Sequence, residues 1–135
     1  MGSEMCIRDR KMTACPKSIA EFYEEAKVDI GVALDHPLNP MLPPYQNKKR
    51  WERTLRNTEE MLSRGCSYVF MPVVHGYTLK DLRRACKEIR HLVGEPTLIG
   101  FGSLVPLLKN AYLGKGFKYF GRNGNHITFL SLIHI

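Results

Sequence analysis

The stretch that decides the fold class is Asp29-Ile-Gly-Val-Ala-Leu-Asp35, a short apolar run that ends in a carboxylate. Consecutive apolar residues over this length predict a strand that is buried on both faces, as the strands of a parallel sheet are. Similar runs at residues 68–74 and 97–100 predict two more strands. The segments between these strands determine how the sheet is built.

Those segments carry apolar residues at helical spacing. Three helices are predicted, one opened by Pro16, one between Asn47 and Gly65, and one between Thr78 and Gly94. Asn47 and Thr78 are residue types that cap a helix, and the two glycines are of the type that ends one. Strands that alternate with helices of this length predict βαβ units, and therefore an α/β fold with a parallel sheet, in a barrel or an open arrangement.

The two ends of the chain differ from its middle. Residues 1–10 (MGSEMCIRDR) and 130–135 (LSLIHI) resemble translated sequencing-adapter DNA read from opposite strands. The first also lacks the apolar core of a signal peptide. We therefore expect both ends to be adapter-derived and residues 11–129 to be an internal fragment of a longer gene. Within it, a further helix is expected over 105–113, followed by a glycine-rich loop.

Composition narrows the class of protein. The 135 residues, of which 44% are hydrophobic, suit one folded domain and exclude a wholly disordered chain. No apolar run approaches the roughly 20 residues of a membrane helix, so no membrane partner is expected. A net charge of +7 favours an anionic partner, with nucleic acid the first candidate. Cys15, Cys66 and Cys86 show no CxxC spacing, which favours reduced thiols in a cytoplasmic protein over a disulfide framework or a zinc site.

Each predicted strand leads into polar or glycine-rich residues. In chain order these are Asp35-His36-Pro37, His75-Gly76-Tyr77 and Gly100-Phe101-Gly102-Ser103-Leu104. Parallel sheets place their chemistry at the carboxyl ends of the strands, so we expect these groups to converge. A carboxylate, an imidazole and exposed backbone amides suit a flat, nitrogen-rich ligand.

Five short motifs carry a family resemblance through their order and spacing. They are Leu34-Asp35-His-Pro-Leu-Asn-Pro40, Arg50-Trp51, Val73-Val74-His75-Gly76, Asp81-Leu82-Arg83 and Ile99-Gly-Phe-Gly-Ser-Leu104. In this order they resemble the tRNA-guanine transglycosylase family, which includes the queuine and archaeosine tRNA-ribosyltransferases. The resemblance covers most of residues 11–104 and implies a partial (β/α)8 TIM barrel of about three to four βα units.

The resemblance also implies a base-binding site. Asp35 would hydrogen-bond the guanine edge of a 7-deazaguanine-type base. His75 stands where the family usually has a base-reading Gln, and Gly102 and Ser103 fall near the glycine whose backbone amide contacts the base. The turn at Gly100–Leu104 is closer to archaeal enzymes and to the DNA-modifying branch of the family, so the nucleic acid is tRNA or DNA.

The family exchanges a base through a covalent intermediate in which an Asp attacks the ribose C1′. The resemblance places that nucleophile, the acid/base Asp and a zinc site outside this chain, so we expect no catalytic residue, no metal and no cofactor here. Zinc and a homodimer are expected only of the full-length pentosyltransferase. The expected partners are nucleic acid and a 7-deazaguanine base, and the fragment itself is expected to be inactive.

Other interpretations of the same residues stay open. Lys48, Lys49 and Arg50 could contact phosphates, although such a triplet is also typical of a solvated helix start. His75 could be a structural histidine. The chain could instead come from a (β/α)8 enzyme of other chemistry, or from a truncated open reading frame that has no function.

Overall fold

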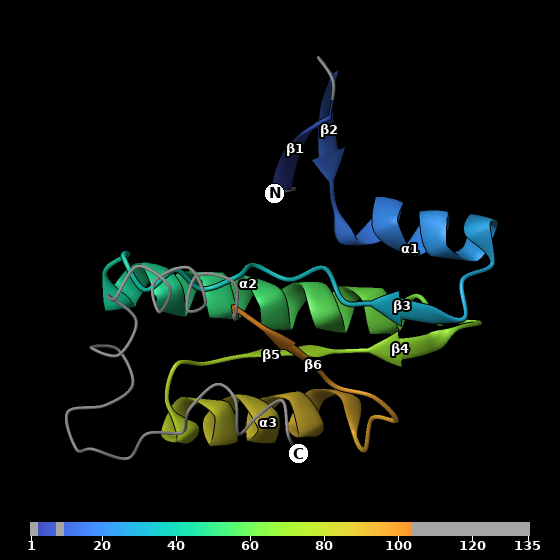
Figure 1. Cartoon of the computed structure of the whole chain (residues 1–135). Helices are drawn as coiled ribbons and strands as arrows, with labels where there is room; N and C mark the ends of the chain where they lie inside the picture. The colour runs from blue at the N-terminus through green and yellow to red at the C-terminus, as the bar shows by residue number, and fades with distance from the viewer. Residues whose placement is uncertain (1–2, 8–9, 104–135) are drawn as a thin grey trace.

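The structure is a computed structural model of the chain, and it describes residues 3–7 and 10–103 (Figure 1). The expected helix at 105–113 and the loop after it lie outside the described residues. In chain order the elements are β1 (Ser3–Ile7), β2 (Arg10–Ala14), α1 (Pro16–Ala26), β3 (Ile30–Val32), α2 (Pro44–Ser63), β4 (Val69–Met71), β5 (Val73–His75), α3 (Leu79–Val93) and β6 (Gly100–Gly102).

The strands of the βαβ units pair in parallel, as predicted. β3 pairs with β4, with Ile30 beside Val69, and β5 pairs with β6, with Val73 beside Gly100. The fold class is therefore α/β. The described residues form no closed barrel.

Pro72 divides the strand that was predicted at residues 68–74. The chain runs on from β4 to β5, but its partner changes at the proline from β3 to β6. Proline has no N–H to give to a ladder, and the Pro72 carbonyl accepts instead from Gly100 N at 2.8 Å. The prediction of one strand was wrong in this respect, and the break is what allows one segment to join two neighbours.

The other two predicted strands differ from the observed ones in their bounds. The strand predicted at 29–35 is shorter, because backbone pairing to the next strand ends where Ala33 N donates to Met71 O at 2.9 Å. The strand predicted at 97–100 lies further on, at Gly100–Gly102, because the register to β5 begins only at Gly100. Burial on both faces is confirmed for β5, whose three residues are all buried, and was wrong for the β3–β4 pair, in which Ile30 and Val69 are 47% and 41% exposed.

The three predicted helices are confirmed, with one change of start. Thr78 caps α3 as expected, its hydroxyl accepting from Asp81 N at 3.1 Å. Asn47 does not cap α2, which begins one turn earlier at Pro44. Proline suits that first turn because its ring fixes a helical φ and its missing N–H would have no partner there. Gly65 and Gly94 both follow their helices with positive φ values of 73° and 76°.

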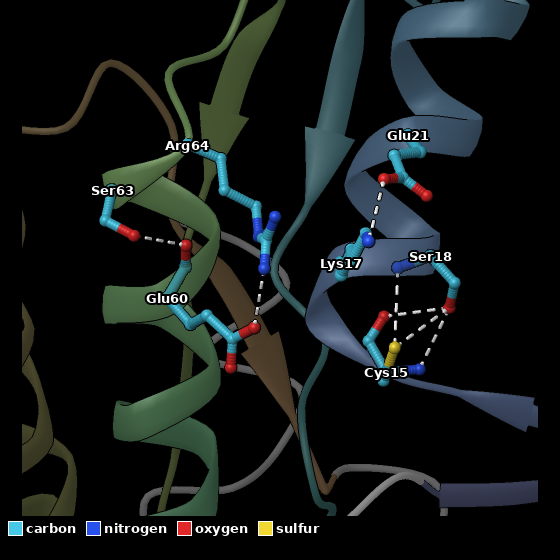
Figure 2. Close-up of polar contacts among 7 residues, drawn as sticks. All are labelled: Cys15, Lys17, Ser18, Glu21, Glu60, Ser63 and Arg64. Atoms are coloured by element: carbon cyan, nitrogen blue, oxygen red, sulfur yellow. Dashed lines mark hydrogen bonds and ion pairs between the residues drawn. The ribbon is translucent and has the colours of Figure 1, made fainter.

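Hydrogen bonds at the ends of α1 and α2 are shown in Figure 2. Cys15 caps α1: its sulfur accepts from Ser18 N at 3.5 Å, and Ser18 Oγ accepts from Cys15 N at 3.1 Å. At the far end of α2, Arg64 pairs with Glu60 at 3.0 Å, and Ser63 Oγ donates to the Glu60 carbonyl at 2.7 Å. Both ends are therefore closed by local partners rather than by tertiary contacts.

The core lies where β5, α3 and α2 pack together. Val74 of β5 packs against Ala85 and Ile89 of α3, and all three are buried. Partly buried side chains surround this centre: Trp51, Leu55, Leu82, Cys86, Val93 and Ile99. Trp51 is therefore a packing residue, and it joins α2 to the core of α3.

A two-stranded hairpin precedes the βα units. β1 pairs with β2 in antiparallel fashion, with Ser3 beside Ala14, and in Figure 1 the hairpin stands clear of α2, α3 and the parallel strands. β1 falls within residues 1–10, the segment expected to be adapter-derived. An isolated two-stranded hairpin of this kind is only marginally stable in water.

Candidate functional site

The predicted convergence of polar groups is observed at the carboxyl ends of the parallel strands. His75 Nδ1 lies 2.8 Å from Ser103 Oγ, and His75 Nε2 lies 2.8 Å from Asp35 Oδ2. Ser103 Oγ also accepts from Leu38 N at 2.6 Å. Three segments far apart in the sequence are therefore joined through one imidazole ring.

The two contacts of the ring differ in kind. The contact with Ser103 is a hydrogen bond. The contact with Asp35 is within ion-pair distance but does not meet hydrogen-bond angles, so His75 Nε2 counts as a buried nitrogen without a hydrogen-bond partner among the described residues. At 2.8 Å, a small rotation of the carboxylate is enough to align it with a donor on His75 Nε2.

The imidazole ring is held in place by what surrounds it. His75 and Gly102 are partners in the β5–β6 register, and a Cβ on Gly102 would come within 2.0 Å of His75 Cε1. The ring of Trp51 meets the imidazole edge-on, with centroids 6.1 Å apart and an interplanar angle of 79°. The glycine therefore makes room for the ring, a role that the strand-end pattern did not predict.

The backbone on either side of Asp35 is held by α2. Leu34 lies just before it, and Asn57 Nδ2 donates to the Leu34 carbonyl at 3.0 Å. On the other side of Asp35, His36 N donates to Thr54 Oγ1 at 2.9 Å. The carboxylate is thus carried by a backbone that is pinned immediately before and after it.

Similar contacts continue along residues 34–39. Arg50 donates to the Pro37 carbonyl at 2.9 Å, and the Asn47 side chain binds both backbone groups of Asn39 at 2.9 and 2.8 Å. At the other end, Leu34 N contacts Met61 Sδ at 3.3 Å. We name these α2 residues the α2 stripe: Asn47, Arg50, Thr54, Asn57 and Met61.

The sequence carried a signal for the α2 stripe that was missed. Its members recur at alternating spacings of three and four, which places them on one face of a helix. The prediction of this helix rested on its apolar spacing and on the residues at its ends. A polar face at this spacing, next to a proline-rich segment that cannot join a sheet, indicates side-chain to backbone bonding.

A cavity of about 660 Å³ lies between α2, α3 and the loop after β3. His75 and Tyr77 form part of its wall, while Asp35, Gly102 and Ser103 do not line it. Near this cavity Trp51 Nε1 donates to Glu88 Oε2, which links the two helices. The cavity therefore adjoins the polar cluster of Asp35, His75 and Ser103 through His75.

Tyr77 stands beside this cluster. Burial raises the pKa of Tyr77 to about 12, against a smaller lowering by Ser103 and Arg50. The Tyr77 hydroxyl is buried and makes no well-aligned hydrogen bond with any described residue. The side chain of Ser103 is nevertheless close enough to lower the pKa of Tyr77. Burial likewise lowers the pKa of His36, together with the positive charges of Arg53 and Arg50.

The basic triplet at the start of α2 is divided among three surroundings. Arg50 bonds the Pro37 carbonyl, and the Lys49 ammonium lies 5.8 Å from the centroid of the Tyr45 ring. Lys48 lines the cavity. The three cations share one turn of a helix, but Arg50 has a structural role in the α2 stripe.

The described residues contain neither a cluster of metal ligands nor a membrane-spanning helix. Within residues 3–7 and 10–103, no three or more His, Cys, Asp or Glu side chains gather closely enough to hold a metal ion. Over the same part of the chain, no helix combines the length and apolar character needed to cross a membrane.

Comparison with known proteins gives the family. No protein-family profile matches the chain. Over 99 residues it is 33% identical to the tRNA-guanine(15) transglycosylase of Methanobrevibacter smithii, which covers 70% of this chain. The chain is related to the tRNA-guanine transglycosylases. The corresponding proteins of Methanocaldococcus jannaschii and Methanococcus aeolicus are 31% and 29% identical over 70% and 74% of the chain.

The relationship to the tRNA-guanine transglycosylases confirms the resemblance drawn from the strand-end motifs. The chain spans about 15% of the length of these curated relatives, so it corresponds to a small part of a transglycosylase. The relatives are named for tRNA, and the assignment to a DNA-modifying branch stays a prediction. Their names support a guanine-exchange relationship. The names say nothing of the roles of individual residues.

Proposed function

We propose that this chain is the base-binding part of a transglycosylase that replaces guanine in a nucleic acid by a 7-deazaguanine base. The observation that carries the proposal is the placement of Asp35 against buried His75 where two parallel strands end. Related enzymes that are named for guanine exchange match over 70% of the chain. In parallel α/β folds, ligands bind at this end of the strands.

The chemistry of the cluster suits a guanine-like edge. A carboxylate accepts hydrogen bonds only, and the edge of guanine offers the N1–H and the exocyclic amino group as two adjacent donors. The side chain of Asp35 is 28% exposed, and on its inner side it contacts the fully buried imidazole of His75. In the proposed site Asp35 accepts from the base, and His75, Gly102 and Ser103 form the wall behind it.

The remaining parts of the proposal concern the whole enzyme. We propose that the βα units belong to a (β/α)8 barrel, which would cover the exposed faces of Ile30 and Val69. The attacking carboxylate would come from another part of that barrel, so this chain alone would bind a base without exchanging it. A cytoplasmic location, a homodimer and zinc elsewhere in the enzyme are parts of the same proposal.

The nucleic acid is proposed to be tRNA, as the names of the relatives suggest. The net charge of +7 supports a polyanionic partner. Lys48 and Lys49 are proposed as phosphate contacts, with Arg50 as a third. A duplex DNA of matched length is the competitor that tests the choice, and tighter binding of the DNA would assign the chain to the DNA-modifying branch.

Calorimetric titration of the chain with free bases tests the proposed function. Guanine should bind, hypoxanthine more weakly because it lacks the amino group, and adenine least because its N1 carries no proton. The variant Asp35→Asn should lose about 10- to 100-fold in guanine affinity, the range expected for hydrogen bonds to a charged group. Asp29→Asn is the matched control, because Asp29 is an exposed carboxylate at the opposite end of the same strand.

The proposal would be overturned by either of two results. One is equal affinity for the three bases, which would mean that no guanine edge is read. The other is an equal effect of Asp35→Asn and Asp29→Asn. Circular dichroism of both variants shows whether a loss of affinity reflects a loss of folding.

A further inference from the structure

We propose that His75 does not touch the base but positions the carboxylate of Asp35, and that Ser103 fixes the ring of His75 in the tautomer that this requires. The inference rests on the proposed function, since it divides the work of that site among its residues. It changes the role of His75 from a base-reading group to a positioning residue. Its evidence is the burial, contacts and anchoring of the three side chains.

Burial separates the two groups that face each other. The side chain of His75 is 0% exposed, whereas that of Asp35 is 28% exposed. The imidazole is closed in by Gly102, which leaves no space for even a methyl group, and by the ring of Trp51. Solvent therefore reaches the Asp35 side chain but not the side chain of His75.

The approach of Asp35 Oδ2 to His75 Nε2 restricts where the ring carries its proton. An ionised carboxylate has lone pairs only, and a neutral imidazole has one N–H and one bare nitrogen. Two sets of lone pairs 2.8 Å apart would repel each other, so Nε2 must carry the proton when Asp35 is ionised. A small rotation of the carboxylate then completes the hydrogen bond.

Ser103 satisfies the other nitrogen in the manner that this tautomer needs. Its Oγ already accepts from Leu38 N, so its own hydroxyl hydrogen is free to be donated to His75 Nδ1. Second partners of this kind are what set the tautomer of a histidine. The backbone of Ser103 has a left-handed φ of 64°, a conformation that few non-glycine residues adopt.

The arrangement has a consequence for base selection. With Nε2–H engaging Oδ2, the other oxygen of an ionised Asp35 carboxylate remains a charged acceptor. In the opposite tautomer, Asp35 would need a proton to donate to the bare Nε2, and its other oxygen would then be an uncharged and weaker acceptor. Ser103 therefore strengthens, through His75, the preference of the site for bases with N–H donors over bases with a lone pair at the same position.

The test uses the whole chain labelled with ¹⁵N in its histidine rings, and the variants Ser103→Gly and His75→Gln. Glycine adopts the φ of residue 103 without strain, so Ser103→Gly removes the hydroxyl without adding backbone strain. Long-range ¹H–¹⁵N spectra distinguish a ring N–H from a bare ring nitrogen. The signals of His75 are those absent from the His75→Gln variant.

We expect His75 to carry its proton on Nε2, both with and without guanine. We expect Ser103→Gly to populate both tautomers, to lose about tenfold in guanine affinity, and to reduce the preference for guanine over adenine. A bare Nε2 in the unaltered chain would overturn the inference. So would a Ser103→Gly variant that keeps either the tautomer or the guanine affinity, or a transfer of the proton to Nδ1 when guanine binds.

Failure of the proposed function gives a different result. If the unaltered chain binds no guanine, the proposed function falls. The tautomers of the free chain and of free Ser103→Gly are measured without any base. They still uphold or overturn the positioning of Asp35 by His75 and Ser103.

Discussion

The imidazole of His75 occupies the space in which a side chain at Gly102 would begin. A Cβ on Gly102 would lie 2.0 Å from His75 Cε1 and 2.4 Å from His75 Nδ1, far inside contact distance. The two residues are partners in the β5–β6 register. The pairing of these strands and the placement of the imidazole are therefore one feature of the structure, and a change at either residue affects both.

Replacement of Gly102 by alanine should destabilise the protein. The added methyl group would have to displace a fully buried ring that is held by Ser103, and overpacking of this kind costs about 1–3 kcal/mol. Urea unfolding followed by circular dichroism measures the change in the free energy of unfolding. In His75→Ala/Gly102→Ala the space for the methyl group exists, so the second substitution should cost much less there.

Gly100→Ala is the matched control in the same strand. A Cβ at Gly100 would meet its nearest neighbour, Val73, at 3.4 Å, which is an ordinary contact. The control should lose little stability. Equal losses for Gly100→Ala and Gly102→Ala would show that a general cost of alanine in β6, and not the imidazole, explains the effect.

The alternation of strands and helices could be read from the sequence because each element leaves a local signal. Apolar runs of strand length, helical repeats and capping residues such as Thr78 depend only on neighbours along the chain. The convergence of Asp35, His75 and Ser103 followed from a topological rule: parallel strands bring their carboxyl ends to one edge. These expectations required no knowledge of side-chain packing.

The remaining features depend on partners that are distant in sequence. The apolar run around Pro72 looks continuous, and only the positions of β3 and β6 show that it serves two strands. The burial of His75 depends on Gly102 and Trp51, which are far from it in the chain. A pattern of residue types indicates that a histidine ends a strand, but it does not show whether that histidine faces a ligand or supports the residue that does.

Loss of the Thr54 hydroxyl should destabilise the segment that carries Asp35. Thr54 is fully buried, and its Oγ1 accepts from His36 N at 2.9 Å. The isosteric variant Thr54→Val leaves that backbone N–H without a partner, at a cost of about 1–3 kcal/mol. Urea unfolding measures the loss, and hydrogen exchange at the His36 amide should become faster.

Thr58→Val provides the comparison, one turn along the same helix. Thr58 is equally buried, but its hydroxyl only donates to the Thr54 carbonyl, which keeps its helical N–H partner when that hydroxyl is removed. The expected loss is below about 1 kcal/mol, because no group is left unpaired. A Thr58→Val variant as unstable as Thr54→Val would show that the bond to His36 contributes nothing particular.

Tyr77→Phe should make the protein more resistant to alkaline pH. The pKa of Tyr77 is raised to about 12 by burial, whereas the unfolded chain ionises near the ordinary value of 10.0. The stabilisation that follows from a raised pKa is fully present below pH 10 and is lost as the pH rises towards 12. The ring is partly reached by solvent, so the effect is discounted to about 1 kcal/mol or less.

Urea midpoints of the two proteins between pH 8 and pH 12 test this, with pH values chosen around the two pKa values. Burial also raises the pKa of Tyr68, but Tyr68 is present in both proteins and cancels in the difference. At neutral pH the variant should be as stable as the parent or slightly more so, because the lost hydroxyl is buried without a hydrogen bond among the described residues. Identical alkaline losses would mean that the Tyr77 phenol ionises as freely in the folded protein as in the unfolded one.

Alkylation of Cys15 should depend on Ser18. The Ser18 side chain, and then the Ser18 backbone N–H, lower the pKa of the Cys15 thiol from its ordinary value of 9.0 by hydrogen bonding to the sulfur. A lowered pKa means more of the reactive thiolate at pH 8 than a free cysteine would have. Ser18→Ala removes the side-chain bond, so the pKa should rise towards 9.0 and carboxamidomethylation at pH 8 should slow about two- to threefold.

Ser63→Ala is the control, because that hydroxyl bonds the Glu60 carbonyl at the end of α2 (Figure 2). A Cys15 rate that is unchanged by Ser18→Ala, or equally slowed by Ser63→Ala, would show that the capping serine does not control the thiol.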